Sequence, residues 1–354
     1  MQRQVADSKY EMHDSTDKIL VYLPSPMGDA ILCTPALRAL RNCFSNSQIF
    51  FLCSDTVGQI LSPSNFNNDW LIINSKNPFN VAKVLRKIKF THAVLFKNSF
   101  GSALACFLAA IPKRTGYARD FRSLFLTDKL VPPKTAEGKF ASGSMIDYYL
   151  KIAQHLGCPV EDRFPSLQIN DNDKKLLYSK YPQLQKLLGM VFILVPGGAF
   201  GPSKCWPAPK FAQTADKLIA KYRASVFVSV SPAPQEKRIA DEICRQSKNK
   251  LLNLAENPPA LGELKALFSI ANLVITNDTG PRHIAVAFKR NVITLFGPND
   301  PAWTDTGWQK EIKIVGQADC APCAKKICKA NQHKCMEAIT VDMVCSAADK
   351  LLSK

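Results

Sequence analysis

Three charged side chains follow apolar, strand-like runs in this 354-residue chain. Asp29, Lys204 and Asp278 each stand in the loop or turn that comes after such a run. A carboxylate at the edge of a cleft can remove a proton, and an ammonium group can bind an anion. Open α/β sheets bind ligands beyond the carboxyl ends of their strands. These three residues are therefore the first candidates for chemistry.

The third of these places is the segment 273–288, which reads LVITNDTGPRHIAVAF. A short strand, a polar turn through Asp278, Thr279 and Gly280, and a helix start would put free backbone N–H groups at one spot. Such a helix start favours a phosphate. His283 lies one helical turn further on and can share this face. The alternatives are an ordinary helix N-cap and a structural histidine.

The first place combines Gly28 with Asp29, in the loop after the first strand and near the next helix. Gly28 lets the backbone pass close to a ligand, and Asp29 can act as a general base. The alternative for Asp29 is a helix N-cap. The surrounding LPSPMGDA lacks the G-x-G-x-x-G spacing of a dinucleotide site, which argues against that class.

The second place is a glycine- and proline-rich loop that contains Ser203 and Lys204, in the run FGPSKCWP. A lysine here can stabilise the negative charge that grows on a departing diphosphate, and Ser203 can add a hydroxyl contact. The alternative is a lysine on an ordinary surface loop.

Strand-like and helix-like runs alternate along the chain, which predicts an α/β fold with parallel sheets. Strands are expected at 19–23, 49–53, 93–96, 191–195, 225–230, 251–254, 273–275, 292–296 and 312–315. Helices are expected at 36–43, 211–221 and 235–245, with another at 340–352. The polar stretch 171–189 separates two sets of strands. We therefore expect a disordered tail at 1–16 and two lobes, 17–180 and 181–354.

The motifs resemble those of glycosyltransferase family 9, the ADP-heptose:lipopolysaccharide heptosyltransferases. That family has a GD pair near its start, a P-G-x-x-(F)-G-x-x-K-x-W-P run, and N-D-[ST]-G-x-x-H-x-A-x-A further on. Here these fall at 28–29, 196–207 and 277–287, within a resemblance that covers about 17–345. The resemblance implies a GT-B arrangement, in which two Rossmann-like lobes face a central cleft, with a last helix crossing back to the first lobe.

The resemblance also implies roles. Asp29 would be the catalytic base, and Lys204 would stabilise departing ADP. Asp278, Thr279, Gly280 and His283 would bind the donor, with Ser203 beside them and Glu236 at the ribose. The reaction implied is inverting transfer of heptose from ADP-L-glycero-D-manno-heptose to the lipopolysaccharide inner core of Gram-negative bacteria, as its second heptose. Pro232, Pro234, Arg282 and Glu256 depart from the family pattern. Another nucleotide-sugar donor, or a non-catalytic nucleotide-sugar-binding protein, are the alternatives.

The N-terminal lobe would bind the acceptor, a phosphorylated lipid A–core. Its basic and amide side chains near the strand at 93–96 suit phosphate groups: Lys97, Asn98, Arg114, Arg119 and Arg122. The alternative is a solvated basic loop. The chain has 46 Lys and Arg against 29 Asp and Glu, a formal net charge of +17. This excess favours an anionic membrane surface over nucleic acid, for which no binding motif is present.

Transfer of this kind needs no cofactor. The C-terminal run CAPCAKKICKANQHKC places Cys320, Cys323, Cys328 and Cys335 close together in sequence. Four thiolates can hold a structural zinc or an iron–sulfur centre, and reduced, unliganded thiols are the alternative. No secretory signal or membrane-spanning run is found, so we expect a cytoplasmic protein at the inner face of the inner membrane.

Overall fold

A computed structural model describes residues 17–138, 140–186, 189–198, 200–329 and 332–353. The tail expected at 1–16 lies outside these residues. The chain forms two compact units. The first comprises Met1–Pro165 with Ala302–Thr306, and the second comprises Ser166–Pro301 with Gly307–Lys354.

The first unit is built on a six-stranded parallel sheet in the order β3-β2-β1-β4-β5-β6. Its strands are β1 (Lys18–Tyr22), β2 (Gln48–Cys53), β3 (Asp69–Ile72), β4 (His92–Leu95), β5 (Lys113–Tyr117) and β6 (Asp128–Leu130). Its helical elements are α1 (Met27–Leu32), α2 (Thr34–Cys43), α3 (Asp55–Leu61), α4 (Pro78–Arg86), α5 (Phe100–Leu108), η1 (Arg122–Phe125) and α6 (Met145–His155). This is the strand order of a doubly wound Rossmann fold.

The second unit repeats that order, with its sheet running β12-β11-β10-β7-β8-β9. Its strands are β7 (Val191–Val195), β8 (Ser225–Val228), β9 (Leu252–Asn253), β10 (Leu273–Asn277), β11 (Asn291–Phe296) and β12 (Glu311–Val315). Every residue of β7 and β10 is buried, because helices cover both faces of the sheet. This explains why these strands read as continuous apolar runs.

Ten helical elements follow Pro165 within the described residues, and nine of them lie wholly in the second unit. They are α7 (Asp171–Lys180), η2 (Pro182–Lys186), η3 (Pro202–Lys204), α8 (Ala208–Tyr222), α9 (Pro234–Gln246), α10 (Leu261–Ile270), α11 (Gly280–Ala287), η4 (Pro301–Thr304), α12 (Lys334–Glu337) and α13 (Val341–Leu352). Most of η4 nevertheless belongs to the first unit. No helix among the described residues is long and apolar enough to cross a lipid bilayer.

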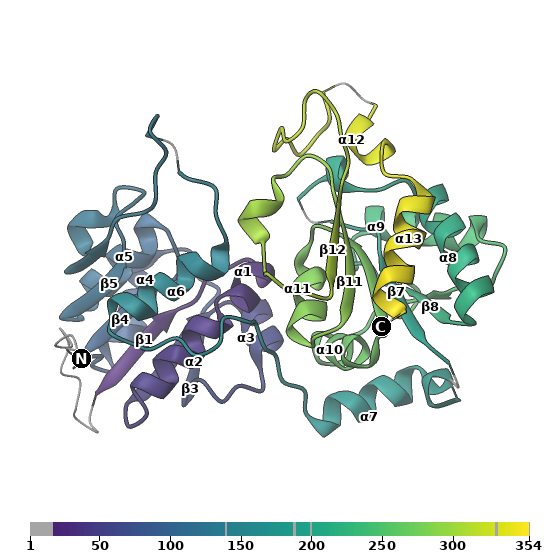
Figure 1. Cartoon of the computed structure of the whole chain (residues 1–354). Helices are drawn as coiled ribbons and strands as arrows, with labels where there is room; N and C mark the ends of the chain where they lie inside the picture. Colours follow the sequence, from purple (N-terminus) through teal and green to yellow (C-terminus); the bar gives the residue numbers. More distant parts are fainter. Residues whose placement is uncertain (1–16, 139, 187–188, 199, 330–331, 354) are drawn as a thin grey trace, which may run out of the picture. The chain divides into compact units, whose positions relative to one another are not determined.

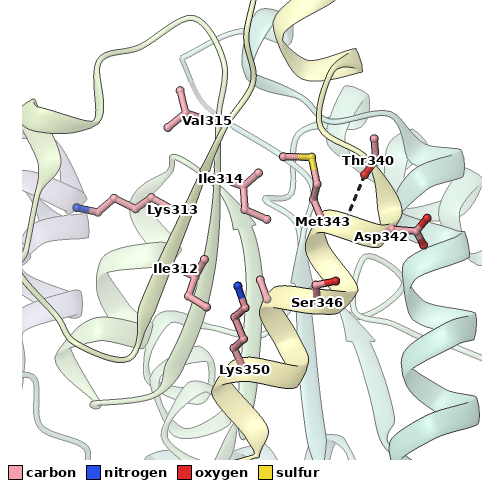
Figure 2. A pocket seen from close by; sticks show the side chains of 10 residues that line it. Ile312, Lys313, Ile314, Val315, Thr340, Asp342, Met343, Ser346 and Lys350 are labelled. Atoms are coloured by element: carbon pink, nitrogen blue, oxygen red, sulfur yellow. Dashed lines mark hydrogen bonds between the residues drawn. The ribbon is translucent and has the colours of Figure 1, made fainter.

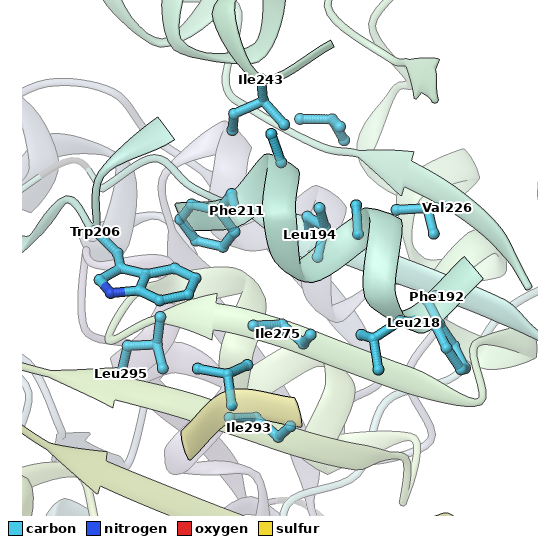
Figure 3. Close-up of a cluster of buried hydrophobic side chains, with 14 of the residues drawn as sticks. Phe192, Leu194, Trp206, Phe211, Leu218, Val226, Ile243, Ile275, Ile293 and Leu295 are labelled. Atoms are coloured by element: carbon cyan, nitrogen blue, oxygen red, sulfur yellow. The ribbon is translucent and has the colours of Figure 1, made fainter. Parts of the chain in front are cut away.

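The core of the second unit lies between its sheet and α8, with side chains from β7, α8, β10 and β11 in one cluster. Trp206 is 1% exposed, packs edge-on against Phe211 and donates from its indole nitrogen to the carbonyl of Ile339, 3.0 Å away. Figure 3 shows Trp206 beside Phe211 and Leu295. The tryptophan therefore ties the loop after β7 to the C-terminal segment.

The strands expected from apolar runs are present, and the fold class α/β with two Rossmann-like units is confirmed. Three strands of the first unit, β3, β5 and β6, were not predicted. β5 reads KRTGY, which has no apolar run, and in β3, which reads DWLI, the short apolar run 70–72 follows a polar stretch. Their place in the sheet is set by pairing with β4 and β2.

Two expectations about connections differ from the structure. The polar stretch expected as a linker contains α7, which has a reciprocal cap between Asn170 and Asp173 and packs on α10. The polar residues at 170–173 thus begin a helix, and the units divide at Pro165. The last helix, α13, packs on α8 and β11 and belongs to the second unit.

Candidate functional site

The candidate residues gather where each sheet changes winding direction. In the first unit, β1 and β4 are neighbours, and the connections that leave their carboxyl ends carry Asp29 and Lys97. In the second unit, β7 and β10 are neighbours, and the connections after them carry Lys204 and Asp278. Crevices at such switch points are where doubly wound sheets bind ligands. Both units thus present polar groups at the position that this fold uses for binding.

Asp29 is the third residue of α1, whose N-cap is Pro26. The N-cap alternative for Asp29 is therefore wrong. Among the described residues, its carboxylate has no hydrogen-bond or ion-pair partner. Burial raises the pKa of Asp29 from 3.8 to about 6. A half-buried carboxylate with a pKa near neutrality suits a general base.

Aromatic side chains of α6 adjoin Asp29. Burial, and then the charge of Asp29, raise the pKa of Tyr149 well above its usual value, which places the two side chains near each other. The neighbouring Tyr148 stacks on Tyr117, with ring centroids 3.9 Å apart. Burial raises the pKa of Tyr148, while Arg119 beside it acts in the opposite direction. The sequence analysis missed Tyr148, because nothing in its local pattern marks α6 as part of a site.

Arg122 is fully buried, which differs from the expectation of a direct acceptor contact. Its guanidinium donates to the carbonyls of Tyr117 and Lys97 and to Oδ1 of Asn98, 2.8 Å away. Burial lowers its pKa to about 10. Because every interaction is internal, Arg122 orients Asn98 and offers no surface to a ligand.

The guanidinium of Arg114 is also taken up by hydrogen bonds to backbone carbonyls. It donates to the carbonyls of Phe125 and Ile111, and its guanidinium lies 5.5 Å from the ring centroid of Phe107. Lys97 and Arg119 remain partly exposed, with Lys97 5.2 Å from the ring centroid of Tyr22. Of the five predicted acceptor residues, Lys97 and Asn98 remain partly exposed. Arg119 already pairs with Asp120, with its Nε 3.0 Å from Oδ2, so it would have to exchange this partner for an anionic ligand.

Lys204 and Asp278 meet in the second unit. The Lys204 ammonium donates to Oδ2 of Asp278 at 2.6 Å and to its backbone carbonyl at 3.0 Å. Both side chains are less than a tenth exposed. Although burial acts to raise it, the cations Lys204 and Arg282 hold the pKa of Asp278 below its usual value. An ammonium has three N–H donors, so one remains for a ligand.

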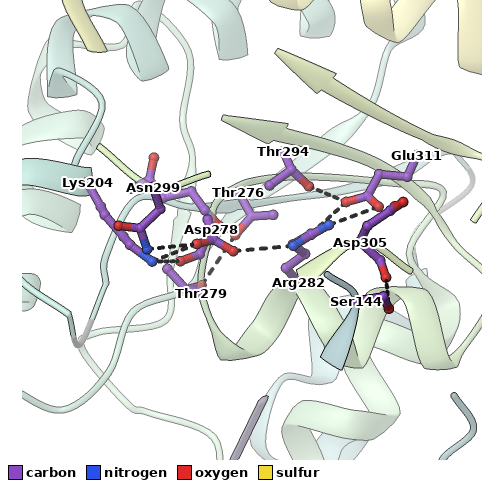
Figure 4. A network of polar contacts seen from close by, with 11 residues as sticks. Ser144, Lys204, Thr276, Asp278, Thr279, Arg282, Thr294, Asn299, Asp305 and Glu311 are labelled. Atoms are coloured by element: carbon purple, nitrogen blue, oxygen red, sulfur yellow. Dashed lines mark hydrogen bonds and ion pairs between the residues drawn. The ribbon is translucent and has the colours of Figure 1, made fainter. Parts of the chain in front are cut away.

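Arg282 and Glu311 extend this network (Figure 4). Both side chains are 0% exposed, and Nε of Arg282 lies 2.6 Å from Oε1 of Glu311. Arg282 also reaches Oδ1 of Asp278 at 3.3 Å, and Thr294 donates to Glu311 at 2.6 Å. The sequence analysis noted Arg282 only as a departure from the family pattern and missed Glu311. No local signal links two residues on different elements.

His283 lies on the buried side of α11, and it is 4% exposed. Burial and the charge of Arg282 lower its pKa to about 3, so the imidazole is neutral at pH 7. Its Nδ1 has no hydrogen-bond partner among the described residues. Thr279 occupies the N-cap position of α11, but its side chain makes no capping hydrogen bond. Gly280 is the first residue of the helix. The turn and helix start predicted here are present, and the anion site at this helix start stays a prediction.

Ser203 has a structural role that differs from the expected donor contact. Its hydroxyl donates to the carbonyl of Lys325 at 2.6 Å, and its backbone N–H donates to the carbonyl of Lys326 at 3.3 Å. Phosphate oxygens only accept hydrogen bonds, and this hydroxyl has already given its proton. Gly201 passes so close that a Cβ there would lie 2.5 Å from the Lys326 carbonyl. The loop before Lys204 is therefore held by the cysteine-rich segment.

Glu236 joins two loops at the same end of the sheet. One carboxylate oxygen accepts from the N–H of Gly198 at 3.1 Å, and the other accepts from Ser231 at 2.9 Å. Gly197 passes so near that a Cβ there would lie 2.2 Å from Glu236 Oε2. Glu236 thus positions the loop after β7, and its remaining lone pairs can accept from a hydroxyl.

The four cysteines of the C-terminal run line one cavity of about 180 Å³, together with His333. Within the described residues, no group of three or more His, Cys, Asp and Glu side chains lies close enough to hold a metal ion. A separate groove of about 530 Å³ lies between β12 and α13 (Figure 2). Its lining includes none of the residues predicted for the donor site.

Comparisons with known proteins agree with this arrangement. A family model described as glycosyltransferase family 9 (heptosyltransferase) matches residues 79–334. Lipooligosaccharide heptosyltransferase 2 of Campylobacter jejuni is 26% identical, over 94% of this chain and 99% of that protein. Lipopolysaccharide heptosyltransferase 2 of Salmonella typhimurium is 28% identical, over 81% of this chain and 84% of that protein.

Among solved structures, ADP-heptose lipopolysaccharide heptosyltransferase II of Escherichia coli is similar, with a TM-score of 0.77. It is 25% identical, and the match covers 95% of this chain and 98% of that one. The resemblance stated from the sequence motifs and the expected GT-B class are therefore confirmed.

Proposed function

This chain belongs to glycosyltransferase family 9, the heptosyltransferases, and from that premise we propose that it transfers heptose from ADP-L-glycero-D-manno-heptose to the lipopolysaccharide inner core. The curated relatives named above are heptosyltransferases 2, which favours addition of the second heptose. One observation carries the proposal: the candidate residues lie where each sheet changes winding direction. Asp29, the candidate base, follows β1 in the first unit, and Lys204 lies beside the start of α11 in the second.

In the proposed reaction, the Asp29 carboxylate takes the proton from an acceptor hydroxyl. The hydroxyl oxygen then attacks the anomeric carbon of the heptose, and the bond from that carbon to the diphosphate breaks. ADP leaves with the bonding electrons, and the configuration at the anomeric carbon inverts. A half-buried carboxylate with a pKa of about 6 is ionised at pH 7 and still basic enough for this task.

The donor would bind at the end of β7 and β10. The free N–H of Lys204 and the start of α11 at Thr279 and Gly280 would stabilise the departing diphosphate, since fixed donors aimed at developing charge need no reorganisation. Asp278 would orient Lys204, and the neutral His283 would lie beneath the same helix start. Glu236 would accept from the ribose hydroxyls.

The acceptor would bind the first unit. Lys97, Asn98 and Arg119 would contact phosphate groups of a lipid A–core, while Arg122 would hold Asn98 in place. Such an acceptor is anchored in lipid, so we place the protein at the cytoplasmic face of the inner membrane. Nucleic acid is not a partner in this proposal, and transfer uses no cofactor.

The cysteine cavity has a structural role in this proposal. Cys320, Cys323, Cys328 and Cys335 line one space, and zinc or an iron–sulfur centre would need their side chains to turn toward one another. The backbone of the same segment already holds Ser203 and therefore the Lys204 loop. Its effect on donor binding would pass through that loop.

The test is a panel of nucleotide sugars offered with core acceptors, with mass spectrometry of the products. We expect transfer of heptose from the ADP-heptose only, and Asp29→Ala should abolish it while leaving ADP affinity within about twofold. Pro232 and Pro234 depart from the family pattern, so another nucleotide sugar is the second candidate for the donor. The same panel of nucleotide sugars would detect it. Binding without any transfer would identify a non-catalytic protein and contradict the proposal.

A further inference from the structure

A 50-residue part of the first unit carries charge of one sign. Nine Lys and Arg and no Asp or Glu lie between Trp70 and Arg119. The whole chain has 29 acids in 354 residues, so about four would be expected in a stretch of this length. No long run of basic residues marks this segment, because its cations are spread over α4, β5 and the connections beside them.

Helix α5 lies within this segment and has no charged residue. Its inner side buries Ala103 and Cys106, while Phe100 and Phe107 on its outer side are 45% and 47% exposed. A surface helix ordinarily turns polar residues to solvent. An apolar outer side on such a helix indicates a surface that meets something other than water.

Helix α4 packs beside α5 (Figure 1). It adds the cations Lys83 and Arg86 to this surface. A groove of about 510 Å³ between them is lined by apolar and basic side chains: Phe79, Ala82, Lys83, Arg86, Lys87 and Leu108. Phe79 is 64% exposed. Among the described residues, Lys83, Arg86 and Lys87 have no ion-pair partner. Their charges are therefore available to an external anion.

The turn η1 packs on α5 and extends the same surface. Phe125 contacts both Phe100 and Phe107, with ring centroids 5.2 and 5.3 Å apart. Leu124 is 85% exposed, and Phe121 is 91% exposed with a φ of 57°. The backbone of Phe121 is strained, because bulky residues rarely adopt the left-handed region. Its side chain is almost fully exposed and therefore adds little to the stability of the fold.

We propose that the α4–α5–η1 face, defined by Phe79, Lys83, Lys87, Phe100, Phe107 and Leu124, docks on an anionic phospholipid surface. The apolar side chains enter the headgroup region, and the lysines contact lipid phosphates. The inference rests on the proposed function in one respect: the protein must come close to the membrane to reach an acceptor that is anchored in lipid. Aliphatic Leu124 offers no stacking surface for a base, which favours lipid over nucleic acid.

This docking would also place the acceptor candidates. Ser99 is the N-cap of α5, so Lys97 and Asn98 directly precede the helix that bears the apolar side chains. A lipid-anchored sugar would then reach these residues from the surface on which the unit sits.

The experiment is cosedimentation of the full chain with vesicles of phosphatidylcholine alone or with 30% phosphatidylglycerol. We expect binding only to the anionic vesicles. Each basic residue near an anionic surface contributes about fivefold to partitioning, so Lys83→Glu with Lys87→Glu should reduce binding at least about tenfold. Lys248→Glu with Lys250→Glu makes the same charge change on exposed residues of the second unit and should stay within about twofold.

The apolar contribution is tested by Phe79→Gln with Leu124→Gln, against Leu176→Gln with Met343→Gln as the control. Leu176 and Met343 are exposed apolar residues of the second unit, at 46% and 43%. We expect the first pair to weaken binding at least about fivefold and the control to leave it unchanged. All the substituted side chains are exposed, and unchanged thermal midpoints would verify folding.

Equal binding to both vesicle types, or retained binding by the Lys83→Glu and Lys87→Glu variant, would overturn the docking proposal. Transfer to a water-soluble, deacylated core acceptor separates this result from the proposed function. The docking variants should keep wild-type kcat and KM with that acceptor. If the wild type transfers no heptose to it, the proposed function fails, whereas the vesicle result still decides the docking surface.

Discussion

The Lys204 ammonium and the Asp278 carboxylate lie 2.6 Å apart, although 74 residues separate them in the chain. Each comes from the connection after a central strand, β7 or β10, and these strands are hydrogen-bonded neighbours. The sheet thus joins two candidates that the sequence analysis had found in separate motifs. Asp278 orients the cation, and the third N–H of Lys204 is left for the ligand.

Removal of Lys204 should weaken ADP binding. Lys204→Ala deletes a charge-assisted contact, for which a loss of about 1.5–3 kcal/mol is typical, so the ADP dissociation constant should rise roughly 10- to 100-fold. Calorimetric titration with ADP measures this. Lys221→Ala is the control, because Lys221 pairs with Asp349 on the exposed side of α8. Unchanged ADP affinity together with unchanged kcat would remove Lys204 from the donor site.

The rate of transfer should depend on the ionisation of Asp29. Burial raises its pKa to about 6, and the base acts only when ionised. We therefore expect kcat/KM to fall tenfold per pH unit below about pH 6 and to level off above it. A pH–rate profile measured with a soluble acceptor tests this. An acid limb that persists unchanged in Asp29→Asn would assign the titration to another group.

Because it is buried, the ionised Asp29 carboxylate should lower the free energy of unfolding. Its pKa is higher in the folded than in the unfolded protein, so the folded state binds the proton more tightly. The ionised carboxylate then destabilises the fold above about pH 6, and this effect disappears below about pH 4. Asn at this position should stabilise the protein by about 1–3 kcal/mol at pH 8 and by nothing at pH 3.5. Chemical denaturation at the two pH values measures the difference.

Breaking the Arg282–Glu311 pair should destabilise the second unit. Arg282→Met leaves the fully buried Glu311 without its cation, which typically costs about 3–5 kcal/mol. Adding Glu311→Leu should restore part of that loss, because the second change removes the uncompensated charge. Urea unfolding of the two single variants and the double variant gives the coupling. Lys217→Ala, which breaks an equally short but exposed pair with Asp342, should change stability little.

Metal content will decide the role of the cysteine cavity. If Cys320, Cys323, Cys328 and Cys335 bind a structural ion, elemental analysis of protein purified without chelator should give about one zinc atom, or the iron of one cluster, per chain. Cys328→Ser should then lose it, while Cys244→Ser, outside the cavity, should keep it. A content well below one atom per chain, with all thiols titratable after mild unfolding, would show unliganded cysteines.

The sequence predicted the parts of the fold that rest on local pattern. Apolar runs located β7, β10 and the other buried central strands, because a strand covered on both faces has few polar positions. The motif residues Asp29, Lys204 and Asp278 were also predicted in the connections after strands, where the structure places Asp29 in α1, Lys204 in η3 and Asp278 directly after β10. The basic strand β5 was missed, since its strand identity depends on pairing with β4.

What the sequence could not predict is how each polar group is used. Arg122 and Ser203 have residue types that suit an anionic ligand, yet both donate their hydrogen bonds to groups within the protein. Arg282 lies in α11 and Glu311 in β12, and only the folded chain brings the two side chains together. The pair therefore cannot be read from the local sequence around either residue. Hydrogen-bond partners at long range carry no local sequence signal.

The assignment of residues 302–306 to the first unit limits how this protein can be divided. The chain passes from the first unit to the second at Pro165 and returns for this short segment. There the carbonyl of Asp305 accepts from Ser144, and that of Thr306 accepts from Arg163. A truncation after 165 would remove these acceptors. Chimeras that exchange the first unit between relatives must therefore transplant two pieces of chain, one that ends at Pro165 and the segment Ala302–Thr306.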